Sequence, residues 1–257
     1  MSHNIMLAIF EKWWWALFFI PGFAIVRYLL SAGSAFLLCY YPGVKFLKKF
    51  KIQPAMPKKK QIRHELIYSF STVFIFSVVG IAVYFLYVNG YTTLYTKIPE
   101  HGWGYLFISL GIMLIIHDGY FYWTHRLLHT KWFFKKVHIV HHRSINPTPL
   151  AAYSFHPLEA LLESLIVFPF IIIFPVHIIV FLFFTFLVII TNVIGHLGFE
   201  FVPKKIRNSY FGKLLTFSTH HNLHHQKSNK NFGYYFTVWD KIMKTLQHDA
   251  NKQGVLK

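Results

Sequence analysis

The sequence predicts an all-α integral membrane protein with about four to five transmembrane or hairpin helices and a helical cap on the cytoplasmic side. Apolar residues make up 54% of the 257 residues, and charged residues only 14%. A typical soluble domain carries about 25% charged residues. The apolar residues are gathered in runs long enough to cross a bilayer, for which roughly 20 are needed. Composition and run length therefore both indicate a chain that is solvated largely by lipid.

The apolar stretches lie at 13–41, 66–88, 103–123 and 158–194. We expect Pro21 and Gly22 to kink the first stretch, and Arg27 inside it to snorkel or to form a buried pair. The fourth stretch is far longer than one crossing requires, so it predicts two helices or one deep hairpin. Pro169 and Pro175 would supply the break in it.

The distribution of basic residues predicts the orientation. The loop 42–65 carries eight lysines and arginines, whereas the connection 89–102 carries only Lys97. Loops rich in these residues stay in the cytoplasm, so the loop 42–65 is expected there. An even number of passes in the fourth stretch would then bring His196 out on the same face as His125. The formal charge of +17 follows this rule and does not indicate nucleic-acid binding.

The sequence divides into N-terminal membrane helices with a basic loop (1–102), a candidate catalytic domain (103–250) and a tail (251–257). From residue 198 onward the chain is basic, aromatic and amphipathic, as expected of a cap on the membrane surface. The single cysteine, Cys39, excludes both a disulfide framework and a thiolate metal site. No convincing cleavable signal peptide is recognisable, because no basic leader precedes the first apolar run.

Histidines are the most informative residues, because 12 of the 17 lie between His125 and His225. Eight of them form three clusters with ligand spacing: His125 and His129; His138, His141 and His142; His221, His224 and His225. Residues three or four apart share a helix face, so two such imidazoles can bind one metal ion. The adjacent third histidine points about 100° away and can serve a second ion. The hairpin would add His196 as a ninth ligand, and the set predicts a site for two ions.

The scarcity of carboxylates narrows the type of site. The chain has nine, and no Glu-x-x-His or HExxH motif occurs. Carboxylate-bridged di-iron bundles need the first motif, and zinc metalloproteases need the second. A structural zinc site needs only four ligands. Imidazole suits iron, copper, zinc and nickel, so the donor type alone does not choose the metal.

The three clusters and their surroundings resemble the fatty acid hydroxylase and sterol desaturase superfamily. The resemblance covers roughly 103–245. Besides the clusters it rests on His117-Asp118, Phe121-Tyr122-Trp123, Ala152 to Glu159, His196 to Glu200, Asn231-Phe232-Gly233 and Trp239-Asp240.

The resemblance implies a non-haem site of two iron ions, in which zinc can substitute, together with O2 and an electron donor. It assigns the ligand role to His125, His129, His138, His141, His142, His196, His221, His224 and His225. Asn192 stands where fatty acid 2-hydroxylases have one more histidine, which favours the sterol-desaturase branch. The glycine that the family has after Trp-Asp is absent here, and Lys244 lies near its place. We expect this difference to change only a local turn.

Four further residues are candidates for supporting roles. His156 could supply the missing ligand or hydrogen-bond near the site, and Asn192 would face the site from one turn before His196. His220 is expected near the third cluster, either behind it or at the surface. Asp118 could orient a ligating histidine, because such imidazoles usually donate their second N–H outward.

These observations favour an enzyme that hydroxylates or desaturates a membrane lipid, with the lipid entering from the bilayer. Sterol, fatty acid, other lipid and carotenoid all remain open as substrates. The sequence carries no dinucleotide-binding motif and too few cysteines for an iron–sulfur cluster, so a ferredoxin or cytochrome should supply electrons. The alternatives are a membrane metal-binding or transport protein and a zinc-dependent hydrolase. The clusters lie at span ends rather than mid-span, and no glutamate neighbours them in the sequence, which disfavours both.

Overall fold

The computed structural model describes residues 13–40 and 45–247. This part of the chain is mostly helical, and four helices in it are long and apolar enough to cross a membrane: Trp13–Tyr40, Lys59–Val88, Gly102–Leu128 and Ile178–Gly195. The all-α membrane fold predicted from the sequence is confirmed.

The first three membrane helices follow the predicted spans, and the second and third extend beyond them. The first runs without a break through α2 (Trp13–Tyr28), the π-turn η1 (Leu29–Gly33) and α3 (Ser34–Tyr40), and Pro21 does not interrupt it. The next two are α4 (Lys59–Val88) and α5 (Gly102–Leu128). Both extend into polar sequence, and α5 thereby carries His125 on its last turn.

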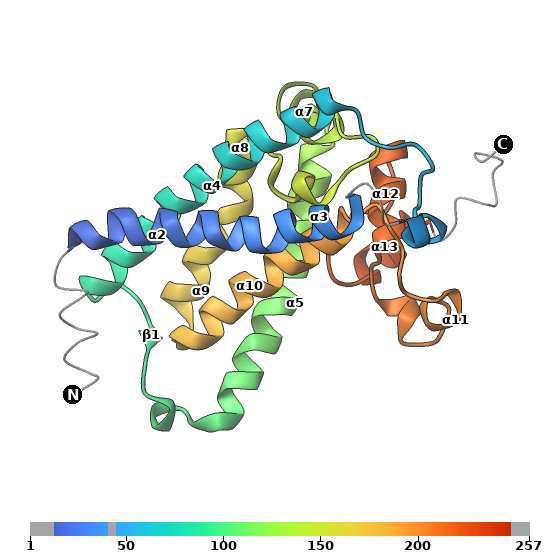
Figure 1. Cartoon of the computed structure of the whole chain (residues 1–257). Helices are drawn as coiled ribbons and strands as arrows, with labels where there is room; N and C mark the ends of the chain where they lie inside the picture. Colours follow the sequence, from blue (N-terminus) through green and yellow to red (C-terminus); the bar gives the residue numbers. More distant parts are fainter. Residues whose placement is uncertain (1–12, 41–44, 248–257) are drawn as a thin grey trace.

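The fourth apolar stretch forms the expected hairpin. One arm consists of α8 (Pro157–Ser164) and α9 (Val167–Ile173), and the other is α10 (Ile178–Gly195). Pro175 lies in the connection between α9 and α10, as predicted. Pro169 lies in the first helical turn of α9 and does not interrupt the helix. A proline is tolerated there because first-turn N–H groups have no partner within the helix. In Figure 1, α9 and α10 lie side by side across the middle of the molecule.

A two-residue parallel pairing joins the hairpin turn to the connection between α4 and α5. Strands β1 (Leu94–Tyr95) and β2 (Val176–His177) form it, with Leu94 opposite Val176. His177 also caps α10, since its Nδ1 accepts from the N–H of Ile179 at 3.2 Å. In Figure 1 the pairing at β1 lies at the opposite end of the molecule from α12, which carries the third histidine cluster, and we expect no chemistry there.

Two apolar cores hold the helices together. One joins α2, α4, α10 and η5 (Pro149–Tyr153) around Tyr28, Tyr153 and Ile189. The other joins α5, α9 and α10 around Met113, Phe170 and Phe184. Arg27 is half-buried, and its guanidinium donates to the hydroxyl of Thr185 on α10 at 3.0 Å.

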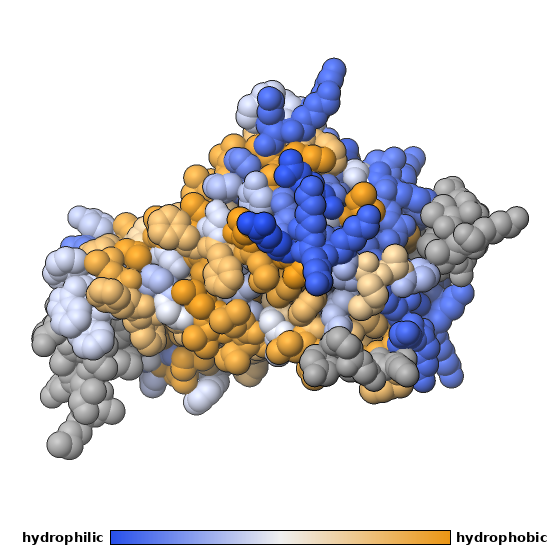
Figure 2. Space-filling model, turned by 45° about the horizontal axis from the view of Figure 1, so that its top comes forward, coloured by the Kyte–Doolittle hydropathy of each residue, from blue (hydrophilic) through white to orange (hydrophobic). Residues whose placement is uncertain are grey.

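Short elements gather at one end of the bundle (Figure 1), and they carry the second and third histidine clusters. Figure 2 shows hydrophobic side chains over the middle of the molecule and hydrophilic ones around this end. The elements here are η2 (Lys45–Phe50), α6 (Lys131–Phe133), η4 (Phe134–His138), α7 (Ile139–His142), α11 (Lys204–Arg207), η6 (Gly212–Leu214), α12 (Ser218–Lys227) and α13 (Val238–Ile242), and η3 (Ile98–Glu100) lies on the α4–α5 connection.

Candidate metal centre

The three histidine clusters come from three elements that meet at this end. The first cluster lies at the end of α5, where His129 is the residue that caps the helix. The second lies across η4 and α7, and the third lies on α12. His196 follows directly after α10, so the hairpin delivers it to the same place. The positive φ of Gly198 (72°) then turns the chain toward the cap, beside the hydroxyl of Tyr40.

All nine predicted histidines belong to two groups, within each of which the ligand atoms lie within 4.8 Å of one another. The first group consists of His125, His129, His138, His142 and His224, and the second of His141, His196, His221 and His225. The two HxxHH clusters are shared reciprocally. In each, the histidines four apart serve one group and the middle histidine serves the other. This sharing places the two groups side by side.

The Nε2 atoms point at one another across each group. In the first group, Nε2 of His224 lies 3.1 Å from Nε2 of both His129 and His142. In the second, Nε2 of His196 lies 2.8 Å from that of His221 and 3.1 Å from that of His141. Imidazole nitrogens bound about 2.0–2.1 Å from one zinc ion would be roughly 3.0–3.4 Å apart, depending on the angle. The spacing therefore fits ligands that converge on a cation.

The outer nitrogens show which ring nitrogen carries the proton in several of these histidines. Nδ1 of His125 donates to the carbonyl of Phe232 at 3.1 Å, and Nδ1 of His224 donates to that of Lys230 at 2.7 Å. Nδ1 of His196 donates to the carbonyl of Asn192 at 2.8 Å. A carbonyl only accepts, so the ring proton lies on Nδ1 and Nε2 presents a lone pair. Nδ1 of His141 likewise lies 3.3 Å from the carbonyl of Ser154, so the facing Nε2 atoms of His141 and His196 both present lone pairs, which repel unless a cation lies between them.

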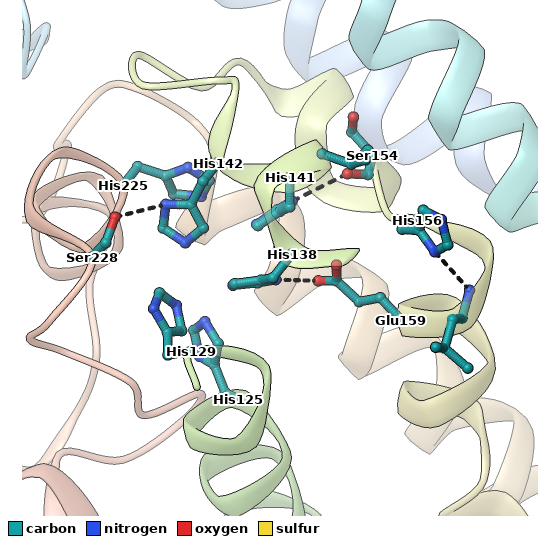
Figure 3. Close-up of polar contacts among 12 residues, drawn as sticks. His125, His129, His138, His141, His142, Ser154, His156, Glu159, His225 and Ser228 are labelled. Atoms are coloured by element: carbon teal, nitrogen blue, oxygen red, sulfur yellow. Dashed lines mark hydrogen bonds and ion pairs between the residues drawn. The ribbon is translucent and has the colours of Figure 1, made fainter. Parts of the chain in front are cut away.

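The second cluster has the most polar support. Nδ1 of His138 donates to Oε1 of Glu159 at 2.8 Å, which leaves the buried Nε2 of His138 aimed inward without a hydrogen-bond partner. Nδ1 of His142 lies 3.2 Å from the hydroxyl of Ser228 (Figure 3). Carboxylate–histidine pairs of this kind orient metal-binding imidazoles and make them better donors. The orphaned Nε2 and this carboxylate fit a metal ion in the first group.

Burial keeps the imidazoles neutral, which is the form that binds metal. Burial lowers the pKa of His224 to about 4 and that of His196 to about 4, although a hydrogen bond to a backbone carbonyl opposes the shift in both. The pKa of His129 is lowered as well, first by burial and then by the neighbouring His224. At neutral pH the site therefore offers lone pairs rather than positive charges.

Three of the four supporting candidates serve the scaffold instead. Asp118 does not hold a histidine: its Oδ1 accepts from the N–H groups of Tyr235 at 2.8 Å and Phe236 at 3.1 Å. His156 caps α8 through the N–H of Leu158 and points away from both groups (Figure 3). His220 is buried at the start of α12, and its Nδ1 accepts from the N–H of Phe217. Helix ends offer free N–H groups, and these imidazoles satisfy them.

Asn192 lies one turn before His196, as expected, and its side chain takes a structural partner. Its Nδ2 donates to the carbonyl of Ala152 at 2.6 Å, while its own backbone carbonyl accepts from His196. Asn192 therefore positions the end of α10 against η5 and supports His196 through the main chain.

Sequence reasoning included three acids in the motifs of the family resemblance but assigned no role to them. Glu159 contacts a cluster, although no glutamate neighbours one in the sequence. Glu200 accepts from the N–H and the hydroxyl of Thr219 at the start of α12. Asp240 accepts from the N–H groups of Phe232 and Gly233 at 2.9 and 2.8 Å. The small number of acidic residues could have indicated these roles, because an acid in an apolar chain needs a polar partner.

Taken together, the fold and the site define a class: all-α membrane proteins whose helices end at two adjoining groups of buried histidines. The fatty acid hydroxylase family model matches residues 110–245, which is more than half of the sequence. The chain belongs to this family, and the matched region contains all nine clustered histidines.

The chain is also similar to curated sterol enzymes. It is 33% identical over 200 residues to the lathosterol oxidase of Mus musculus, covering 76% of this chain and 64% of that protein. It is 32% identical over 222 residues to a Delta(7)-sterol 5(6)-desaturase of Gibberella zeae, covering 86% of this chain and 65% of the relative. The chain thus spans slightly less than two thirds of the length of these relatives. No solved structure matches it.

Proposed function

We propose that this chain is a membrane-bound, sterol-desaturase-like oxidoreductase that uses O2 and external electrons to desaturate or hydroxylate a C–H bond of a lipid. The observation that carries the proposal is the convergence of nine neutral imidazoles into two adjoining groups with inward-facing Nε2 atoms. The names of the similar proteins favour a sterol among the possible lipids. The catalytic part would be 103–250, anchored by 1–102.

The nine histidines would hold two iron ions, one in each group, and these ions would supply O2 activation when bound. Zinc can occupy the same donors in a purified sample, because imidazole accepts both metals. The chain's own contribution is to fix the ligand atoms. The Nδ1 hydrogen bonds to Phe232, Lys230, Asn192 and Glu159 hold the ring orientations, and burial excludes water.

The overall reaction must balance in electrons. Desaturation removes two hydrogens from the lipid and converts O2, two electrons and two protons into two waters. Hydroxylation inserts one oxygen atom and forms one water from the same reactants. A ferredoxin or cytochrome would deliver the two electrons at the cytoplasmic face, where basic residues follow the first cluster. The basic loop 42–65 supports this orientation.

The alternatives find less support. Mid-span ionisable residues along a path would favour a transport protein, whereas these histidines gather at helix ends. Glu159 does lie beside a cluster, contrary to expectation, but it contacts the outer Nδ1 of His138. It is thus on the far side of the ring from the proposed metal, and this contact does not place it as the base of a zinc hydrolase.

The test is a reconstituted reaction. The full chain would be loaded with Fe(II) in detergent and supplied with O2, reduced ferredoxin and lathosterol. Mass spectrometry should detect loss of two hydrogens or gain of one oxygen, and His141→Ala should abolish either product. Metal analysis should find two ions per chain. One ion per chain, or no product from lathosterol or a panel of membrane lipids, would contradict the proposal.

A further inference from the structure

A cavity of about 360 Å³ leads from within the membrane helices to the second histidine group. Its walls come from α5 and α10 and from two segments of the cap, 215–217 and 233–236. Leu114 and Leu187 line its inner part, and His221 lines the end nearest the second group. From Leu187 to Gly195 it follows α10 for about 12 Å, at 1.5 Å per residue. The cavity is thus elongated along a membrane helix.

The cavity reaches the two groups unequally. Among the described residues, His221 is the histidine that lines it, and His221 belongs to the group of four. Asn192, where a further imidazole would be expected, lines the cavity as well. Catalytic metal sites keep a position open, whereas closed sites are filled by protein ligands. The second group therefore combines fewer ligands with access from the cavity.

The mouth of the cavity lies where lipid can reach it. Ile194 is 50% exposed and Leu215 is 42% exposed, and both line the cavity. The preceding segment exposes Tyr210 (79%) and Phe211 (75%) close to Lys213. Aromatic and basic side chains together are typical of the membrane–water interface. The opening would then lie at the level of the lipid headgroups rather than in bulk water.

We infer that this cavity is the passage and binding site through which a sterol enters from the bilayer and presents a carbon to the second group. Its volume and its apolar lining with a few polar groups, Thr191, Asn192 and Thr216, are typical of small-molecule sites. The choice of a sterol as the ligand rests on the proposed function, but the test measures binding and does not require catalytic turnover.

The experiment uses the zinc-loaded full chain in detergent and a sterol that carries a photoreactive diazirine on its ring system. After irradiation, labelled peptides are mapped by mass spectrometry with and without excess lathosterol. Labels should concentrate at 187–195 and 233–236, and lathosterol should suppress them. Leu187→Trp should reduce this labelling by about tenfold, because a larger side chain overpacks the cavity. Leu182→Trp is the matched control, since Leu182 lies on the same helix but is 48% exposed.

Zinc content shows that each variant retains the site, and Leu114→Trp repeats the test from the opposite wall. Labelling spread over α2 and α4, or equal labelling of the Leu187→Trp and Leu182→Trp proteins, would overturn the inference. Because zinc-loaded protein does not turn over, competed labelling in the cavity supports the passage even if the iron-loaded enzyme fails to oxidise lathosterol.

Discussion

The two histidine groups are built from the same donor atoms but differ in what surrounds them. The first group has five imidazoles, and one of these donates to the carboxylate of Glu159. The second group has four, with His196 supported by a backbone carbonyl and His221 bordering the apolar cavity. The difference teaches that one group has more ligands and a side-chain partner for His138, while the other has fewer ligands and borders a cavity. In the proposed enzyme, the lipid would meet the second group.

Removing one imidazole from each group should have the largest effect. His142→Ala should reduce the bound metal from two ions to one by emptying the first group, and His225→Ala should do the same at the second. Turnover should fall by more than about 100-fold in both, because even outer partners of a ligand contribute roughly 10–100-fold. Metal analysis and lipid product formation measure these effects. Full metal retention in either variant would break the assignment of two separate groups.

Acidification should destabilise both groups of the metal-free protein alike. The pKa of His224 in the first group and of His196 in the second are each lowered to about 4 by burial. Unfolded histidines bind protons below about pH 6.5, while the folded ones do not until about pH 4, so stability falls as the pH drops through this window. Each histidine should cost about 1.4 kcal/mol per pH unit. Thermal unfolding after chelation, compared at pH 7 and pH 5, measures the loss. Equal stability at the two pH values would contradict buried neutral imidazoles.

Glu159→Gln should weaken the first group specifically. The amide keeps the shape but is a weaker hydrogen-bond acceptor for Nδ1 of His138, so affinity for the first ion should fall by about 10–100-fold. Asn192→Ala should retain both ions, because its side chain contacts the carbonyl of Ala152 and its backbone carbonyl remains. Metal titration with a competing chelator distinguishes the two variants. A larger loss in Asn192→Ala than in Glu159→Gln would reverse the comparison.

The first group should also face the electron donor. Lys135 and Lys136 are exposed beside the second cluster and would steer an acidic protein toward it. Reversing both to glutamate should slow reduction by a ferredoxin about tenfold at low salt, and less at high salt. The matched control reverses Lys204 and Lys205, which precede the cavity mouth. If both double variants slow reduction equally, docking does not distinguish the groups. Stopped-flow reduction kinetics supply the measurement.

The sequence predicted the long helices well because apolar run length reports the membrane directly. It placed the start of α4 too late, since the helix continues through polar residues to Lys59. It also could not predict the pairing of Leu94 with Val176, a two-residue contact between distant segments. Histidine spacing grouped eight imidazoles into three clusters, because helical periodicity is local, and the expected hairpin added His196 to them. The partners of those imidazoles, such as Glu159, depend on tertiary packing, and spacing carries no information about it.

Substitution of Lys244 should have the smallest effect. Lys244 lies in the turn after α13, where the carbonyl of Thr245 accepts from the N–H of Asn231. Lys244 has a positive φ of 56° directly after α13, and the N–H groups of Lys244 and Thr245 donate back to Lys241 and Asp240. Glycine is the usual residue at this position of a helix end. Lys244→Gly should relieve roughly 1–2 kcal/mol of strain but lose about 0.5–1 kcal/mol through the more flexible unfolded chain. We therefore expect a small net stabilisation of roughly 0.5 kcal/mol in thermal unfolding. Lys244→Ala keeps the β-carbon and should give no gain, so equal stabilisation by both variants would exclude backbone strain as the cause. Metal content should stay unchanged in both, because the strain lies in the turn and not in either histidine group.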